Sequence, residues 1–234
     1  AILLFDKEKV NKFDSFIEKL KENLSEPIRV DENEFHFTFS IGIAVFPEDG
    51  KTADDLMKNA DTAMLKAKST GKNLLRRFEK RMNDELYDKL LLERDIRKAL
   101  ENGEFHIFYQ PQVSLADHSI TGVEALIRWY HPERGFVEPV EFIPLAEEVG
   151  LINRIGEWVF TKACKFSVKI NKNRTVPIPV SVNVSPVQLL QHDFLNRFTN
   201  IIDKTGVNPG WMVIEITESA LMESHKENAS KLVN

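Results

Sequence analysis

Strand-like and helix-like segments alternate through the second half of the chain, and this alternation limits the possible folds more than any other feature. Two strand-like runs come first, at 105–113 and 120–130, joined by a polar turn at 116–119. Helices and strands then follow in turn at 140–149, 153–170, 178–184, 186–204 and 211–217. The first two runs predict an antiparallel hairpin. The later alternation predicts parallel βα units, which build either a barrel or an open doubly wound sheet.

The run from 122 to 129 places an acid and a guanidinium on the same face of a strand. Side chains of a strand alternate between two faces, so Glu124, Leu126 and Arg128 share one face, opposite Val123, Ala125, Ile127 and Trp129. Glu124 and Arg128 are about 13 Å apart along an extended chain. This spacing suits one anionic ligand held between a metal-bound carboxylate and an arginine. The alternative is an amphipathic strand whose polar face is solvated.

Three oxygen-bearing side chains recur toward the ends of predicted strands: Glu124, Asn183 and Glu215. Their separation is that of successive βα units, and in a TIM-type barrel such positions converge at the C-terminal end. The sequence therefore favours the barrel over the open sheet. Oxygen donors without imidazole or thiolate favour Mg²⁺ or Mn²⁺ over zinc or copper. Alternatively, Asn183 caps the helix that begins near Pro186, and Glu215 is satisfied by a neighbouring donor.

Four segments in the first part of the chain resemble a known protein family. The segments are Ser40-Ile41-Gly42-Ile43-Ala44, Pro47-Glu48-Asp49-Gly50, Ala60-Asp61 and Ala67-Lys68-Ser69-Thr70-Gly71-Lys72-Asn73. Together they resemble the C-terminal part of a GGDEF domain, the diguanylate cyclase family. The resemblance implies GTP as a ligand and phosphate contacts from Lys68 and Lys72, although lysines are also favoured at a solvated helix C-terminus.

Two positions depart from the GGDEF pattern, because the family usually has arginine at Lys72 and tyrosine at Leu65. The glycine pair that names the family is missing from these 234 residues, so we do not expect this sequence alone to act as a cyclase.

A second resemblance covers the chain from about Leu90 onward. It rests on Tyr109-Gln110-Pro111, Glu124-Ala125-Leu126-Ile127-Arg128-Trp129, His131-Pro132, Gly135, Pro139, Phe142-Ile143-Pro144-Leu145-Ala146-Glu147, Gly150-Leu151-Ile152, Ser181-Val182-Asn183-Val184-Ser185 and Glu215-Ile216-Thr217-Glu218-Ser219. These segments resemble the EAL domain family, phosphodiesterases that cut cyclic di-GMP to linear pGpG.

The resemblance to EAL domains implies a role for particular residues. Glu124, Asn183 and Glu215 would bind metal, and Gln110, Leu126 and Arg128 would line the dinucleotide pocket. Glu218 would act beside Glu124 in catalysis, as the acid that fixes a loop near the metal and a homodimer interface. The family's aspartate pair, lysine, further glutamate and glutamine do not occur in this sequence, so we expect the fragment alone to be inactive.

Composition and charge exclude some classes of protein. The net charge of −5 argues against a protein that binds nucleic-acid polymers nonspecifically. No apolar run approaches the roughly 20 residues of a membrane span, and no signal peptide opens the sequence. A single cysteine, Cys164, allows no internal disulfide and fits a cytoplasmic protein.

We therefore expect an α/β chain with three parts: the C-terminal part of a GGDEF domain at 1–78, a connecting helix at 79–102, and the N-terminal part of an EAL barrel at 103–234. The expected function is metal-dependent hydrolysis of cyclic di-GMP. The alternatives are a cyclic di-GMP receptor without activity and a bifunctional cyclase and phosphodiesterase.

Overall fold

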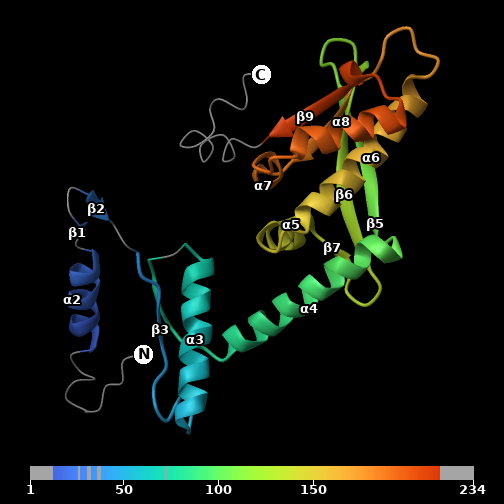
Figure 1. Ribbon diagram of the computed structural model, residues 1–234. Coiled ribbons are helices and arrows are strands. Elements are labelled where there is room, and N and C mark those ends of the chain that lie inside the picture. Colours follow the sequence, from blue (N-terminus) through green and yellow to red (C-terminus); the bar gives the residue numbers. More distant parts are fainter. Residues whose placement is uncertain (1–12, 26, 31–32, 36–37, 72, 217–234) are drawn as a thin grey trace. The chain divides into compact units, whose positions relative to one another are not determined.

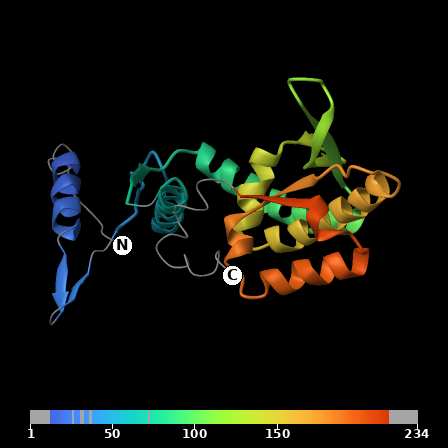
Figure 2. The same ribbon diagram turned by 90° about the horizontal axis from the view of Figure 1, so that it is seen from above.

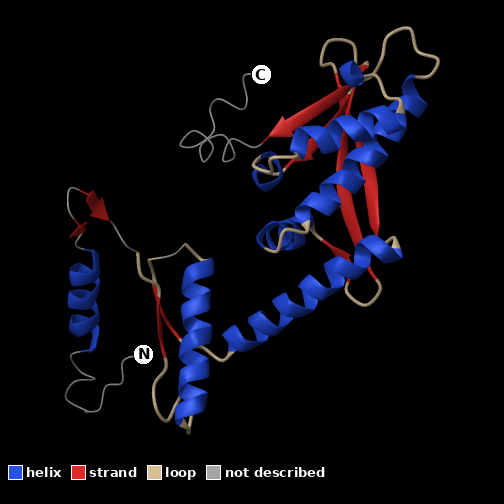
Figure 3. Cartoon of the chain, viewed as in Figure 1, coloured by secondary structure: helices blue, strands red, loops and turns tan. Residues whose placement is uncertain are grey.

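The computed structural model describes residues 13–25, 27–30, 33–35, 38–71 and 73–216 (Figures 1 and 3). The chain divides into two compact units, Ala1–Leu90 and Leu91–Asn234. None of the helices in the described part has the length and apolar character needed to cross a bilayer.

The first unit contains two pairs of short strands, and one helix packs against the second pair. Its elements are α2 (Phe13–Ser25), β1 (Ile28–Val30), β2 (Asn33–Phe35), β3 (Ile41–Ile43), α3 (Ala53–Ser69) and β4 (Leu75–Arg77). Strands β1 and β2 pair antiparallel, whereas β3 and β4 pair parallel, and α3 contacts both β3 and β4.

Helix α3 begins with a capping box. The Thr52 hydroxyl oxygen accepts a hydrogen bond from the Asp55 backbone N–H at 3.1 Å, and the Asp55 carboxylate accepts the Thr52 N–H at 3.3 Å. Hydrogen bonds from Thr52 also lower the pKa of Asp55. Two otherwise unpaired backbone donors are thus satisfied, and the helix has a defined start.

Gly42 allows β3 to approach α3 closely. A Cβ atom at this position would lie 2.0 Å from the carbonyl oxygen of Ala60 and 2.3 Å from the backbone nitrogen of Met64. Both atoms belong to the helix backbone and cannot rotate away. The glycine in the Ser-Ile-Gly-Ile segment is therefore required by packing.

Replacing Gly42 by alanine is expected to lower the free energy of unfolding of the first unit by about 1–3 kcal/mol, because strand and helix must separate. Urea denaturation followed by circular dichroism measures the change. Lys51→Ala, at an exposed position before the same helix, is the control and should change stability by less than about 0.5 kcal/mol. A Gly42→Ala variant as stable as this control would contradict the packing argument.

The second unit is a mixed sheet with helices packed against one face. Its elements are β5 (Phe105–Val113), β6 (Ile120–His131), β7 (Gly135–Val137), α5 (Pro139–Glu148), α6 (Ile152–Asn171), β8 (Val180–Val184), α7 (Pro186–Leu189), α8 (Phe194–Thr205), the 3₁₀ turn η1 (Pro209–Trp211) and β9 (Met212–Ile216). Helix α4 (Arg81–Asn102) precedes them and runs through the boundary between the units.

The strand order is β5-β6-β8-β9, with β7 paired to β6. Strands β5 and β6 form the predicted antiparallel hairpin, whose turn extends beyond the sheet (Figures 1 and 2). Strands β6, β8 and β9 are parallel, joined through helices as in a TIM-type barrel.

The core lies between the sheet and its helices. The buried strand residues of this core are Phe105, Ala125, Trp129, Val137, Val180, Val182 and Val184. Helix α6 contacts β5, β6 and β8 and carries Cys164, whose thiol is fully buried. Burial raises the pKa of this thiol to about 11. The single cysteine is therefore an unreactive core residue.

One predicted helix is interrupted. The sequence predicts a continuous helix over 186–204, but the structure has α7 and α8 separated by a short turn. Helix α7 is a single turn capped by Ser185 and Gln188, and it ends at Leu189. The apolar spacing of the two segments is compatible with one helix, which is why periodicity alone did not show the break.

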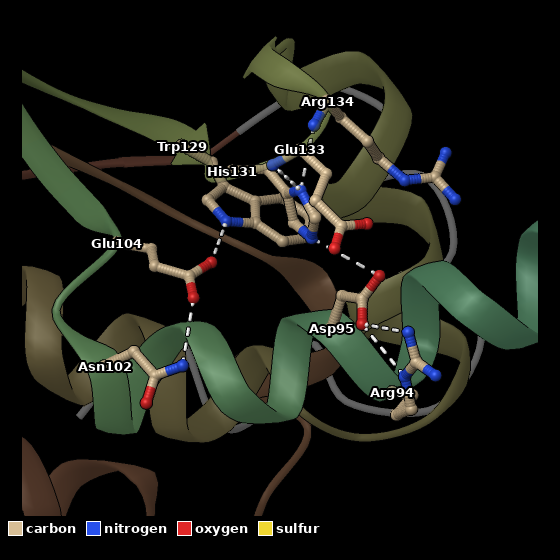
Figure 4. Close-up of polar contacts among 8 residues, drawn as sticks. All are labelled: Arg94, Asp95, Asn102, Glu104, Trp129, His131, Glu133 and Arg134. Atoms are coloured by element: carbon tan, nitrogen blue, oxygen red, sulfur yellow. Dashed lines mark hydrogen bonds and ion pairs between the residues drawn. The ribbon is translucent and has the colours of Figure 1, made fainter.

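The second half of α4 is attached to the end of β6 (Figure 4). Nδ1 of His131 accepts hydrogen bonds from the backbone N–H groups of Glu133 and Arg134, at 3.1 and 3.0 Å. The imidazole proton therefore lies on Nε2, which faces the Asp95 carboxylate at 3.3 Å. Asp95 also accepts two hydrogen bonds from Arg94. His131 thus holds the turn after β6 and faces α4.

A second set of contacts joins the same elements (Figure 4). Nε1 of Trp129 donates to one oxygen of Glu104 at 3.0 Å, and Nδ2 of Asn102 donates to the other oxygen at 3.1 Å. The end of α4 and the end of β6 are therefore held by polar contacts as well as by the core.

Candidate functional site

The polar face of β6 lies opposite the helices. Val123, Ala125 and Trp129 are buried, whereas Glu124, Leu126 and Arg128 are only partly covered. This is the division between faces that the alternating sequence predicted. In the register of the hairpin, Gln110 of β5 lies directly opposite Glu124.

Glu124 and Asn183 touch. Nδ2 of Asn183 donates a hydrogen bond to Oε1 of Glu124 at 2.7 Å, although the two residues are 59 positions apart in the sequence. Asn183 is in turn the direct neighbour of Glu215 in the parallel register of β8 and β9. Three adjacent strands therefore bring together the three candidate metal ligands.

The position of Glu124 within its strand differs from the prediction. Asn183 and Glu215 are each the last residue but one of their strands, as predicted. Glu124 lies near the middle of β6, because pairing with β5 and β7 extends this strand to His131. Since β8 pairs with only a short part of β6 around Glu124, the three residues still lie on neighbouring strands near the end of β8.

The three donors fit a hard divalent cation. The hydrogen bond to Glu124 uses the amide nitrogen of Asn183, so its carbonyl oxygen is the atom suited to coordination. Two carboxylates and one amide oxygen are ligands that Mg²⁺ and Mn²⁺ accept. In the part of the chain that the structure describes, no three acidic, histidine or cysteine side chains gather as a metal cluster.

Arg128 is held apart from these ligands. Its Nη1 donates to the carbonyl oxygen of Ile127 at 2.8 Å, and its guanidinium carbon lies 5.8 Å from the centre of the Phe108 ring. Contact with an aromatic face favours a cation and limits its motion. Among the contacts described, none joins Arg128 to Glu124 or Asn183. Its place on the same face would allow it to reach another part of a long anionic ligand.

The remaining predicted site residues lie in several parts of the chain. Leu126 lies between Glu124 and Arg128 on the shared face of β6. Lys68 is exposed in the last turn of α3, in the first unit. Lys72 and Glu218 lie outside the described residues.

Two partly buried side chains next to the strand that carries Asn183 were not among the predicted site residues. Glu147 of α5 and Ser185, which follows β8, form a hydrogen bond of 2.7 Å. The Ser-x-x-Gln spacing of a capping box was a readable signal for Ser185. Glu147 belongs to a segment that carries the EAL resemblance, but its own contact gave no signal, because a lone acid on an amphipathic helix resembles any solvated residue.

Comparison with known families decides which kind of domain this face belongs to. The family model for the EAL domain matches residues 93–234, and the model for the diguanylate cyclase GGDEF domain matches residues 1–74. The chain belongs to the EAL domain family. The fold of the second unit is accordingly part of an EAL-type TIM barrel, preceded by part of a GGDEF domain.

Several bacterial signalling proteins are similar to this chain. The bifunctional diguanylate cyclase/cyclic di-GMP phosphodiesterase MucR of Pseudomonas aeruginosa is 38% identical over 205 residues, which are 88% of this chain and 30% of MucR. The cyclic di-GMP phosphodiesterase PdeR of Escherichia coli is 34% identical over 198 residues, 85% of this chain and 30% of PdeR. The chain thus spans less than a third of the length of these relatives.

Solved structures of EAL proteins are also similar in fold to this chain. The phosphodiesterase MucR in complex with c-di-GMP has a TM-score of 0.55 at 34% identity, over 58% of this chain and 55% of that one. The cGMP-bound EAL enzyme Bd1971 has a TM-score of 0.55 at 32% identity, over 61% of this chain and 41% of that one.

Proposed function

We propose that the protein is a metal-dependent phosphodiesterase that hydrolyses cyclic di-GMP to linear pGpG. The hydrogen bond between Asn183 and Glu124, on strands that also align Asn183 with Glu215, is the observation that carries the proposal. Relatives named as cyclic di-GMP phosphodiesterases support the substrate and the reaction.

The positions of the described residues and the EAL resemblance support a role for each site residue. Glu124, Asn183 and Glu215 hold Mg²⁺ or Mn²⁺, and Asn183 also orients the Glu124 carboxylate through its amide. An ion held there would supply polarisation of the phosphodiester and a bound water molecule of lowered pKa as the nucleophile. Arg128 binds phosphate charge, while Gln110 and Leu126 line the dinucleotide pocket beside Glu124. Glu218 completes the site as the acid that fixes a loop near the metal.

The wider proposal concerns the partners of the whole protein. We expect a homodimer formed through the EAL domain, located in the cytoplasm, where a free buried cysteine such as Cys164 is common. The match of residues 1–74 to the GGDEF domain favours a second candidate function, a bifunctional enzyme. In that case Lys68 and Lys72 would contact the phosphates of GTP.

Metal removal tests the proposed reaction. The full-length protein is incubated with cyclic di-GMP and Mg²⁺, and pGpG is followed by chromatography. We expect pGpG with Mg²⁺, none after chelation with EDTA, and recovery when Mg²⁺ is returned. Tight binding of cyclic di-GMP without any metal-dependent product would contradict the enzyme and identify a receptor. Formation of cyclic di-GMP from GTP would identify the bifunctional enzyme.

A further inference from the structure

A single side-chain hydrogen bond links α5 to the segment that follows β8. The Ser185 hydroxyl donates to Oε1 of Glu147 at 2.7 Å, and both side chains are partly buried. A hydroxyl bonded to a carboxylate at this distance is a charge-assisted hydrogen bond, about twice as strong as a neutral one. Glu147 therefore restrains Ser185 directly.

Other contacts fix Ser185 against a second helix. Its backbone N–H donates to Oε1 of Gln188 at 3.2 Å, and its hydroxyl oxygen accepts the Val187 N–H at 3.2 Å. Gln188 is itself buried, and its amide packs against Gly156 of α6, where a Cβ atom would lie 1.9 Å from Nε2. The turn after β8 is thus fixed to α5 through Glu147 and to α6 through Gln188.

Only Val184 separates this turn from Asn183. Ser185 has extended backbone dihedrals, so its Cα lies about 6.6 Å from that of Asn183, two residues along the strand. A movement of Ser185 is therefore transmitted to Asn183 through two peptide units. The hydrogen bond from Asn183 to Glu124 carries the same displacement to the next strand.

We propose that Glu147 is a positioning residue for the metal site. Through its hydrogen bond to Ser185, it fixes the position of the Asn183 side chain, and Asn183 in turn fixes the Glu124 carboxylate. This inference rests on the proposed function, since it assigns a cation to these residues. Glu147 acts through Ser185 and is not itself a ligand. When a residue that hydrogen-bonds to metal ligands and orients them is removed, the affinity for the metal commonly falls by about 10- to 100-fold.

The first test measures metal binding without catalysis. Binding of Mn²⁺ to the full-length protein is titrated by electron paramagnetic resonance in the absence of cyclic di-GMP. Glu147→Ala is expected to weaken Mn²⁺ binding about 10-fold or more. Glu147→Gln should bind Mn²⁺ nearly as the wild type does, because its amide oxygen can still accept the Ser185 hydrogen bond.

Two further variants separate positioning from stability. Glu141→Ala removes an exposed acid from the same helix and should leave Mn²⁺ affinity unchanged. Glu147→Ala and Ser185→Ala each remove the same hydrogen bond between the two side chains. The double variant should therefore bind Mn²⁺ no more weakly than whichever of the two single variants binds it more weakly. Circular dichroism establishes that each variant is folded.

The outcomes distinguish this inference from the proposed function. A folded Glu147→Ala variant that binds Mn²⁺ like the wild type, even with a lower unfolding temperature, overturns the positioning role and leaves hydrolysis untouched. A wild type that binds no Mn²⁺ also overturns it. If Glu147→Ala weakens Mn²⁺ binding but the wild type yields no pGpG, the positioning role stands and the proposed hydrolysis fails.

Discussion

Replacing Glu124 by alanine is expected to lower kcat/KM for cyclic di-GMP hydrolysis by about 10³-fold or more. The change removes a carboxylate ligand and leaves the Asn183 amide without the acceptor that it has at 2.7 Å. A bound metal ion contributes several kcal/mol of transition-state stabilisation, and about 4 kcal/mol corresponds to 10³ in rate. Formation of pGpG by the full-length protein measures the effect.

Two controls make the Glu124 result specific. Glu101→Ala removes an exposed acid on α4 and should leave kcat/KM unchanged. Glu124→Gln keeps an oxygen that can accept from Asn183 but loses the negative charge, so it should also be strongly impaired if the charge holds a cation. Activity of Glu124→Ala within tenfold of the wild type would exclude Glu124 as a metal ligand.

Replacing Trp129 by alanine is expected to reduce the free energy of unfolding of the EAL unit by about 3–5 kcal/mol. The indole is fully buried, with ring centres of Phe105 and Phe142 at 5.5 and 5.4 Å. Alanine would leave a cavity in the middle of this aromatic cluster. Denaturant unfolding followed by circular dichroism gives the change in free energy.

Trp129→Phe separates packing from hydrogen bonding. Phenylalanine keeps most of the ring contacts but loses the Nε1–H donated to Glu104 at 3.0 Å. The expected loss is therefore smaller, about 1–3 kcal/mol. If the alanine and phenylalanine variants were equally stable, the aromatic packing would not be the main contribution of Trp129.

The sequence predicted the two faces of β6 because the side-chain period of a strand is two. The same rule separates buried Trp129 from partly covered Glu124 and Arg128. A second regularity, the repeat of βα units, predicted that Asn183 and Glu124 lie close together, because such units place neighbouring strands side by side. Local sequence patterns were sufficient to predict the place of a side chain wherever one strand period or one βα repeat determined it.

Contacts that depend on how separate elements pack were not predictable in this way. The hydrogen bond between Glu147 and Ser185 joins residues 38 positions apart on different elements, and neither helical period nor strand alternation reports it. The length of β6 beyond Glu124 depends on the extra pairing with β7. The division of α7 from α8 depends on a cap and a turn, which apolar spacing does not register.

The reversed direction of β5 has a consequence for how the EAL unit is connected to the rest of the protein. Phe105, the first residue of β5, pairs with Trp129 near the end of β6, and the last turn of α4 is bonded to the same place through Glu104. In a barrel whose first strand ran parallel to its neighbours, the chain would enter at the opposite end. Here the chain enters at the C-terminal end of β6, so a pull or twist on α4 acts on the strand that carries Glu124 and Arg128.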